Sequence, residues 1–87
     1  MPRVQIPRAF QTLTGGQEVV TAGGRNVRQL IHELDARYPG LQSALMEGDR
    51  LKPDVRVALD GTIGQLGALD SLEGVQEVLF LPAMNGG

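Results

Sequence analysis

The sequence predicts an α+β fold in which a mixed sheet of four to five strands carries one main helix on one face. The first observation is the order of the patterns along the chain, which reads strand, strand, helix, strand, short strand, strand. The second is one long amphipathic segment, and the third is an almost unbroken apolar run near the carboxyl end. A chain of 87 residues has room for one hydrophobic core, so we expect a single small domain.

The first two strands are predicted from alternation and β-branched content. Arg3-Val4-Gln5-Ile6 alternates polar and apolar side chains, which is typical of a half-buried strand that Pro7 limits. The turn signal Thr14-Gly15-Gly16 follows, and the segment from Gln17 to Thr21 is strand-like. Two strands around a Gly-Gly turn indicate a hairpin whose connection is longer than a two-residue turn.

The main helix is predicted to begin after Asn26, an N-cap residue with Gln29 at the third helical position. Pro39-Gly40 ends it. The apolar residues at helical spacing are Val27, Leu30, Ile31, Leu34 and Tyr38. They form one face of a helix, and this face is expected to pack on the sheet.

The middle of the chain predicts shorter elements. Residues 41–45 allow one more helical turn, and 47–50 read as a polar loop. Residues 55–59 alternate as a strand, and Asp60-Gly61 is a hairpin turn leading to a short return strand at 62–63. Leucines at three-residue spacing within 64–74 indicate a 3₁₀ or single helical turn.

The last strand is predicted over Glu77-Val78-Leu79-Phe80-Leu81. Its apolar run is expected of a central strand that is covered on both faces. Pairing should stop near Pro82, because proline lacks the N–H that a ladder needs. We therefore expect a domain over residues 1–82 and a flexible Gly-Gly tail over 83–87, whose reach when extended is roughly 17 Å.

Composition excludes several classes of function. A net charge of −2 without a Lys/Arg run argues against nucleic acid as a partner. The absence of cysteine excludes disulfides, thiolate metal sites and a thiol nucleophile in this chain. No apolar run is long enough to span a membrane, and the start lacks a signal-peptide core, so a cytoplasmic protein is expected.

Internal catalysis has little support in the sequence. The one histidine, His32, reads as an exposed or boundary helix residue, and no cluster has metal-ligand spacing. Ser43 and Ser71 have no His/Asp partners nearby, and the glycine pairs lack a following Lys-Ser/Thr of a phosphate-binding loop. The terminal Gly86-Gly87 is the one feature that has no evident role in forming the fold.

Three stretches carry a resemblance to a known family. They are Glu77 to Gly87, with Pro82 after an apolar strand and a terminal Gly86-Gly87; Arg37-Tyr38-Pro39-Gly40-Leu41; and Thr14-Gly15-Gly16-Gln17. The chain resembles the ubiquitin-like sulfur carriers, which include the small subunit of molybdopterin synthase and the carriers of thiamine and cysteine synthesis. The resemblance covers the whole chain in element order and implies the β-grasp fold.

The resemblance also implies a reaction at Gly87. An E1-like adenylyltransferase would activate the Gly87 carboxylate with ATP, sulfide would convert it to a thiocarboxylate, and a sulfur-accepting biosynthetic enzyme would take the sulfur. Gly86 has no side chain and would therefore not obstruct a narrow channel into the active site of the partner enzyme. No permanently bound cofactor and no metal are implied. The partner-binding residues would be Leu81, Met84 and an outward-facing Phe80, with core packing as the alternative for Phe80.

Two alternative functions remain open. One is a ubiquitin-like modifier conjugated to target lysines through Gly87. Lys52 is the sole lysine, so linkage of one copy of the protein to another has only one acceptor and is not favoured. The other is the small subunit of molybdopterin synthase. Among carrier pathways, Thr14-Gly15-Gly16-Gln17 favours cysteine synthesis over the molybdopterin, thiamine and siderophore pathways.

Overall fold

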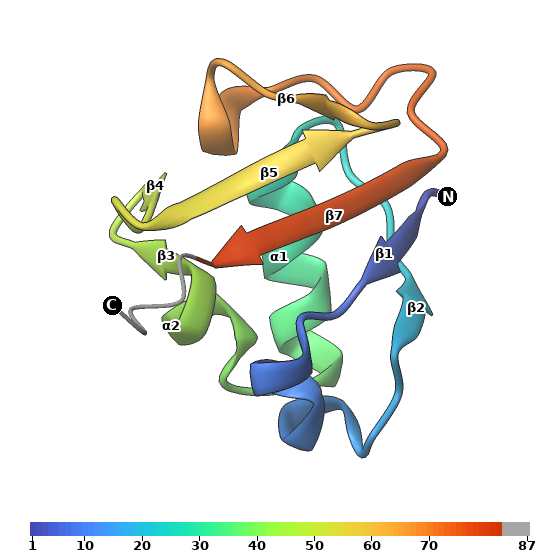
Figure 1. The fold of residues 1–87 in the computed structure, drawn as a ribbon, viewed down its shortest axis with the longest axis vertical. Coiled ribbons are helices and arrows are strands. Elements are labelled where there is room, and N and C mark those ends of the chain that lie inside the picture. Colours follow the sequence, from blue (N-terminus) through green and yellow to red (C-terminus); the bar gives the residue numbers. More distant parts are fainter. Residues whose placement is uncertain (83–87) are drawn as a thin grey trace.

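The computed structural model describes residues 1–82, which form a five-stranded sheet with a helix packed on one of its faces (Figure 1). The helix α1 (Val27–Arg37) lies behind the sheet in this view. In spatial order the strands are β2 (Val19–Thr21), β1 (Arg3–Gln5), β7 (Glu77–Pro82), β5 (Val55–Leu59) and β6 (Thr62–Ile63). This arrangement confirms the predicted α+β class.

The sheet is mixed because its two chain ends lie side by side. β1 pairs parallel with β7 and antiparallel with β2, whereas β5 pairs antiparallel with both β7 and β6. The last strand of the sequence is therefore the middle strand of the sheet, as predicted. A central β7 flanked by β1 and β5, with α1 across one face, is the β-grasp arrangement.

α1 begins where the capping signal predicts. The Asn26 side-chain oxygen accepts a hydrogen bond from the Gln29 N–H at 2.9 Å. The Gln29 side chain reaches back to accept from the Arg25 N–H, also at 2.9 Å, one residue earlier than a standard capping box requires. Both contacts satisfy donors at the start of the helix and its approach, and they fix the point at which the chain enters α1.

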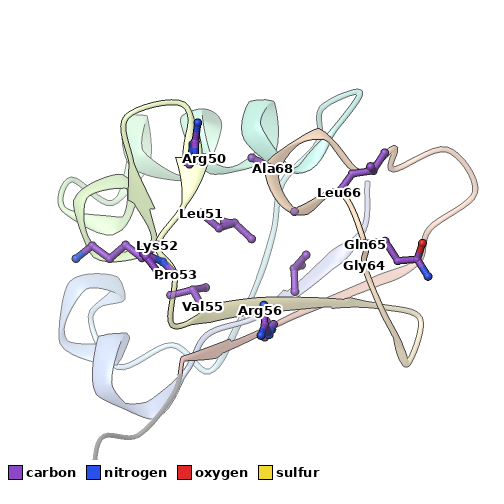
Figure 2. Close-up of a pocket in the computed structure, with 12 residues that line it drawn as sticks. Arg50, Leu51, Lys52, Pro53, Val55, Arg56, Gly64, Gln65, Leu66 and Ala68 are labelled. Carbon is purple, nitrogen blue, oxygen red and sulfur yellow. The ribbon is translucent and has the colours of Figure 1, made fainter.

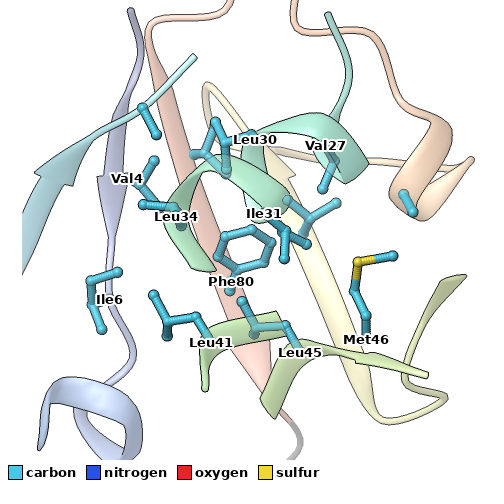
Figure 3. Close-up of a cluster of buried hydrophobic side chains, with 14 of the residues drawn as sticks. Val4, Ile6, Val27, Leu30, Ile31, Leu34, Leu41, Leu45, Met46 and Phe80 are labelled. Carbon is cyan, nitrogen blue, oxygen red and sulfur yellow. The ribbon is translucent and has the colours of Figure 1, made fainter. Parts of the chain in front are cut away.

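The core lies between α1 and the sheet (Figure 3). The fully buried side chains of α1 are Val27, Leu30, Ile31 and Leu34, which are four of the five residues predicted for this face. Phe80 of β7 lies beneath them and is 1% exposed. Because Phe80 is the largest fully buried side chain, its packing ties β7 to α1.

The short helices at 41–45 and 67–69 follow the sequence prediction. α2 (Leu41–Leu45) buries its two leucines in the core, and η2 (Gly67–Leu69) is a single 3₁₀ turn. The Asp35 carboxylate accepts hydrogen bonds from the N–H groups of Gly40 and Gln42, at 3.0 and 3.1 Å, and so joins the end of α1 to the start of α2.

The first missed element is a 3₁₀ helix, η1 (Arg8–Thr14), where the sequence predicts only a connection into a turn. The Thr14 side chain explains its stability. Thr14 is buried, and its hydroxyl lies 3.1 Å from the Gln11 carbonyl oxygen and 2.8 Å from that of Gln17. The hydroxyl therefore closes the turn through Gly15 and Gly16, both of which have positive φ.

The second missed element is a small hairpin, β3 (Met46–Glu47) with β4 (Arg50–Leu51), where a polar loop is predicted. Gly48 has a φ of 65°, which the turn of this hairpin requires. The sequence shows no strand pattern here, because the residues between Met46 and Leu51 are polar or glycine and only Met46 and Leu51 contribute to core packing. Two-residue strands are too short to give an alternating pattern in the sequence.

The prediction that both faces of β7 are covered is wrong, because only one face is buried. Val78 and Phe80 point into the core, but Leu79 is half-buried and Leu81 is 38% exposed on the opposite face. The domain has one helical layer, so alternation along the strand sends every second side chain away from it. Pairing with β5 also extends through Pro82, opposite Val55, one residue beyond the predicted strand.

The two faces of β7 predict different costs of truncation. Phe80→Ala should destabilise the fold by about 3–5 kcal/mol, because it removes a fully buried aromatic ring. Leu81→Ala should cost roughly 1 kcal/mol or less, since this side chain is partly in water already. Urea unfolding of both variants measures the difference, and equal losses of stability would contradict the assignment of the faces.

Candidate functional site

The candidate site is the carboxyl end of β7 together with the sheet face beside it. β7 is paired on both sides at Val78 and Leu79, and Gln5 of β1 lies opposite Leu79. Pro7 follows soon after and ends β1, so Leu81 and Pro82 have partners only on β5. The strand thus leaves the sheet along β5, with Pro82 opposite Val55.

The start of β7 is held by the turn between β5 and β6. The Asp60 carboxylate accepts hydrogen bonds from the N–H groups of Gln76 at 3.1 Å and Glu77 at 2.8 Å. The Asp60 N–H donates to the Glu77 carbonyl oxygen at 2.9 Å. Asp60 has a φ of 50°, a left-handed conformation that aspartate tolerates better than most residues. Sequence reasoning identified this turn but missed its contact with β7.

The face of the sheet opposite α1 carries a row of side chains that crosses all five strands; we call it the open face. The register places Gln5, Ala58 and Leu79 side by side in its middle. Val19 of β2 and Ile63 of β6 complete the row at the two edges, and they are 46% and 48% exposed. Four of these five side chains are apolar, as expected of an interface.

Polar groups gather at one end of the open face, whereas the other end carries the apolar Leu81 beside the charged Arg56. At the start of β7, Glu77 lies 3.9 Å from the Arg3 guanidinium and accepts a hydrogen bond from the Gln5 side chain at 3.0 Å. At the end of β7, Leu81 lies opposite Arg56, and both are exposed. On this face the apolar side chains of β7 therefore run from Leu79 to Leu81, and the last of them lies next to a cation on β5.

The predicted site residues fall into three groups. Leu81 lies on the open face, where it is 38% exposed. For Phe80 the sequence leaves partner contact and core packing open, and the structure buries it with Val78 on the helix side, because neighbouring residues of a strand face opposite ways. Met84, Gly86 and Gly87 lie outside the described residues.

Sequence reasoning missed Val19, Ile63 and Leu79 as members of the open face. Val19 and Ile63 are isolated apolar residues in short strands, and only the long-range register brings them into one row with Leu79. Strand alternation alone could have placed Leu79 beside Leu81 once Phe80 was assigned to the core.

In the described part of the chain, the candidate site consists of the open face and the paired strand β7. Within residues 1–82, no three His, Asp or Glu side chains are grouped to hold a metal ion. His32 is exposed on α1, the helix that packs on the face of the sheet opposite the open face. No helix in this part of the chain is both long and apolar enough to cross a bilayer.

Solved structures with the same architecture are found in several organisms. A chain in the crystal structure of the Amycolatopsis orientalis BexX/CysO complex superposes with a TM-score of 0.84 and 28% identity, and each chain is covered completely. Mycobacterium tuberculosis CysO gives 0.79 and 28%, over 97% of this chain and all of that one. Haloferax volcanii SAMP1 gives 0.74 at 20% identity, over 98% and 97% of the two chains, and supports the fold alone.

Sequence comparison identifies the family. Among curated protein sequences there is no significant match. The model of the ThiS family, however, matches residues 4–87, which is nearly the whole chain and includes the final Gly-Gly. With the fold described above, this match confirms the resemblance that the sequence itself carries: the chain belongs to the ThiS family of ubiquitin-like sulfur carriers.

Proposed function

We propose that this chain carries sulfur as a thiocarboxylate on Gly87, formed after ATP-dependent adenylation by a partner enzyme. The observation that carries the proposal is the ThiS family match, which extends through Gly87. The arrangement of β7 supports it, because the strand that leads to the tail is the central strand of the sheet. The thiocarboxylate would then donate its sulfur in cofactor or cysteine biosynthesis.

Two displacement steps make up the charging reaction. First, a Gly87 carboxylate oxygen attacks the α-phosphorus of ATP, and pyrophosphate leaves. Second, hydrosulfide attacks the acyl carbon of the adenylate, and AMP leaves with the oxygen that joined it to the carbon. The product is a thiocarboxylate whose sulfur is a nucleophile at neutral pH. ATP is thus a substrate of the adenylyltransferase, and the carrier itself is the second substrate.

The domain's part in this reaction is to position the tail. Asp60 holds the start of β7, and β5 holds its last two residues, so Pro82 is a fixed point. From that point the five remaining residues reach roughly 17 Å when extended. Gly86 and Gly87 have no side chains to obstruct a narrow active-site channel. A rigid anchor lowers the entropy cost of holding the carboxylate at the α-phosphorus.

Docking of the adenylyltransferase would use the open face near Leu81, together with Met84 of the tail. Leu81 and Ile63 are exposed apolar side chains, and burying them against a partner would be favourable. The solved BexX/CysO complex supports the idea that chains of this fold act through partner proteins. The same face would serve the enzyme that accepts the sulfur, because that enzyme must also receive the tail.

Cysteine synthesis is the pathway that we propose first. The Thr14-Gly15-Gly16-Gln17 segment resembles the carriers of that pathway, and in the structure it forms the turn that the buried Thr14 hydroxyl closes. Two of the solved structures described above, each 28% identical to this chain, bear the same name, CysO. The acceptor enzyme ultimately decides the pathway, and the molybdopterin, thiamine and siderophore pathways use carriers of the same architecture.

Charging can be followed by the mass of the intact chain. Incubation with the adenylyltransferase, ATP and sulfide should add about 16 Da, the difference between oxygen and sulfur. Deletion of Gly87 should abolish the gain and leave the melting temperature unchanged, because Gly87 lies beyond β7. A mass gain on the truncated chain would contradict the assignment of Gly87. Ladders of conjugates on other proteins would instead identify a ubiquitin-like modifier.

A second prediction concerns the open face. Leu81→Asp should lower kcat/KM for adenylation by roughly tenfold or more, because it places a charge in an apolar contact. The matched control is His32→Asp, which adds the same carboxylate to the exposed side of α1. ATP–pyrophosphate exchange measures both variants. Equal rates for the two would contradict docking through the open face.

A further inference from the structure

Arg56 is the cation that lies beside Leu81 on the open face, at the point where β7 ends. The register places the two residues directly opposite each other, one pair before Pro82 and Val55. We infer that the adenylyltransferase binds Arg56 with an acidic side chain, next to the apolar contact that covers Leu81. This inference rests on the proposed function, because it concerns the enzyme that docks on the open face.

The Arg56 side chain projects from β5 toward the open face. Its neighbours in the strand, Val55 and Val57, are buried on the helix side, so alternation turns Arg56 the other way. Arg56 also borders a cleft of about 280 Å³ between the β3–β4 hairpin and η2. Figure 2 shows its side chain below β5, whereas Arg50 extends upward along the hairpin, where it lies opposite Glu47. A partner on the open face therefore contacts Arg56 as a single guanidinium.

Arg56 forms no salt bridge within residues 1–82. Two salt bridges are found in this part of the chain, one at the start of β7 and one between α1 and the β3–β4 turn, and neither includes Arg56. The acid nearest in sequence is Asp54, which is exposed in the turn before β5. Asp54 lowers the local positive potential, but a loose surface pair of this kind contributes little.

The carboxylates at the far ends of the two strands are remote from Arg56. Glu77 lies four residues before Leu81 along β7 and accepts a hydrogen bond from the Gln5 side chain. Asp60 follows Arg56 by four residues and accepts from backbone N–H groups at the start of β7. At about 3.3 Å per residue, each lies roughly 13 Å away, beyond the Debye length of about 8 Å at physiological ionic strength. Neither therefore neutralises the guanidinium.

The β6 side of the open face does not supply a free carboxylate either. Ile63 and Gln65 carry no charge. Asp70 lines a hollow of about 450 Å³ together with Ile63, and its carboxylate accepts a hydrogen bond from the Leu66 N–H at 3.1 Å. Within residues 1–82, the charge of Arg56 is thus left for a partner to neutralise.

Any enzyme that covers Leu81 also takes Arg56 out of water. Directly opposite side chains on neighbouring strands have Cβ atoms only about 4.5–5.5 Å apart, so one contact covers both. A guanidinium that loses its water without gaining a partner costs more free energy than burial of a leucine provides. A carboxylate on the enzyme offsets this cost by a charge-assisted pair, and an enzyme without one is discriminated against.

The anion that we infer is a side chain of the enzyme and not a phosphate of ATP. In an extended tail, Gly87 lies roughly 17 Å beyond Pro82, whereas Arg56 lies beside the residue that precedes Pro82. Arg56 is therefore remote from the reacting atoms. It determines which enzyme binds and how tightly, so its loss should act on KM and leave kcat nearly unchanged.

Steady-state adenylation by the enzyme that charges the wild-type chain tests this inference. Arg56→Met removes the charge and keeps an apolar stem of similar length, whereas Arg56→Lys keeps the charge. We expect Arg56→Met to raise KM for the carrier roughly tenfold or more with kcat within about twofold, and Arg56→Lys to lie between it and the wild type. The matched control is Arg25→Met, in the exposed loop before α1, which should leave KM unchanged.

Two further measurements separate an ion pair with the enzyme from other roles of Arg56. The wild-type KM should rise as NaCl is raised from about 50 to about 300 mM, and the KM of Arg56→Met should rise much less. Asp54→Asn should leave KM unchanged or lower it, because Asp54 is not the partner of Arg56. All of these variants should keep the wild-type melting temperature, since the substituted side chains are exposed or conserve the charge.

Three outcomes would overturn the inference. A KM of Arg56→Met equal to or below that of the wild type would mean that docking uses only the apolar stem. An equal rise for Arg25→Met would indicate an effect of net charge, and an equal rise for Asp54→Asn would indicate a pair within the carrier. Charging is followed in parallel by the gain of about 16 Da. A wild-type chain that gains no mass would overturn the proposed function as well, whereas a charged wild type with an unchanged KM for Arg56→Met would overturn this inference alone.

Discussion

The pairing of β7 between β1 and β5 is the interaction on which the rest of the structure depends. It joins the two ends of the described chain in one sheet, and it brings Val78 and Phe80 under α1. Because the strand is central, its direction is set by ladders on both sides and by the Asp60 contacts at its start. A tail attached at Pro82 therefore begins from a fixed position, which a frayed edge strand would not provide.

The same strand serves two surfaces through simple alternation. Phe80 points into the core and stabilises the fold, while Leu79 and Leu81 point to the open face. A domain with one helical layer leaves the other face of its sheet in water, and here that face is largely apolar in its central row. The apolar run of β7 thus reflects one face packed in the core and one face on the open side of the sheet.

Most of the fold could be predicted from local patterns, and the exceptions have physical causes. α1 has a cap and a strong 3.6-residue pattern, and β5 and β7 have long apolar or alternating runs. η1 and the β3–β4 hairpin depend on a buried Thr14 hydroxyl and a Gly48 turn, which local periodicity does not reveal. Leu81 could be assigned to the site, but Val19 and Ile63 join it only through strand register, which is set by long-range pairing.

A crystal structure of the chain bound to its adenylyltransferase and ATP would test whether the domain docks through its open face and delivers the Gly87 carboxylate to the nucleotide. We expect the open face around Leu81 to be buried in the interface. We also expect a Gly87 carboxylate oxygen about 3–3.5 Å from the α-phosphorus, the distance of a near-attack arrangement. An interface formed by another face of the domain, with Gly87 remote from the nucleotide, would contradict this mode of docking and delivery.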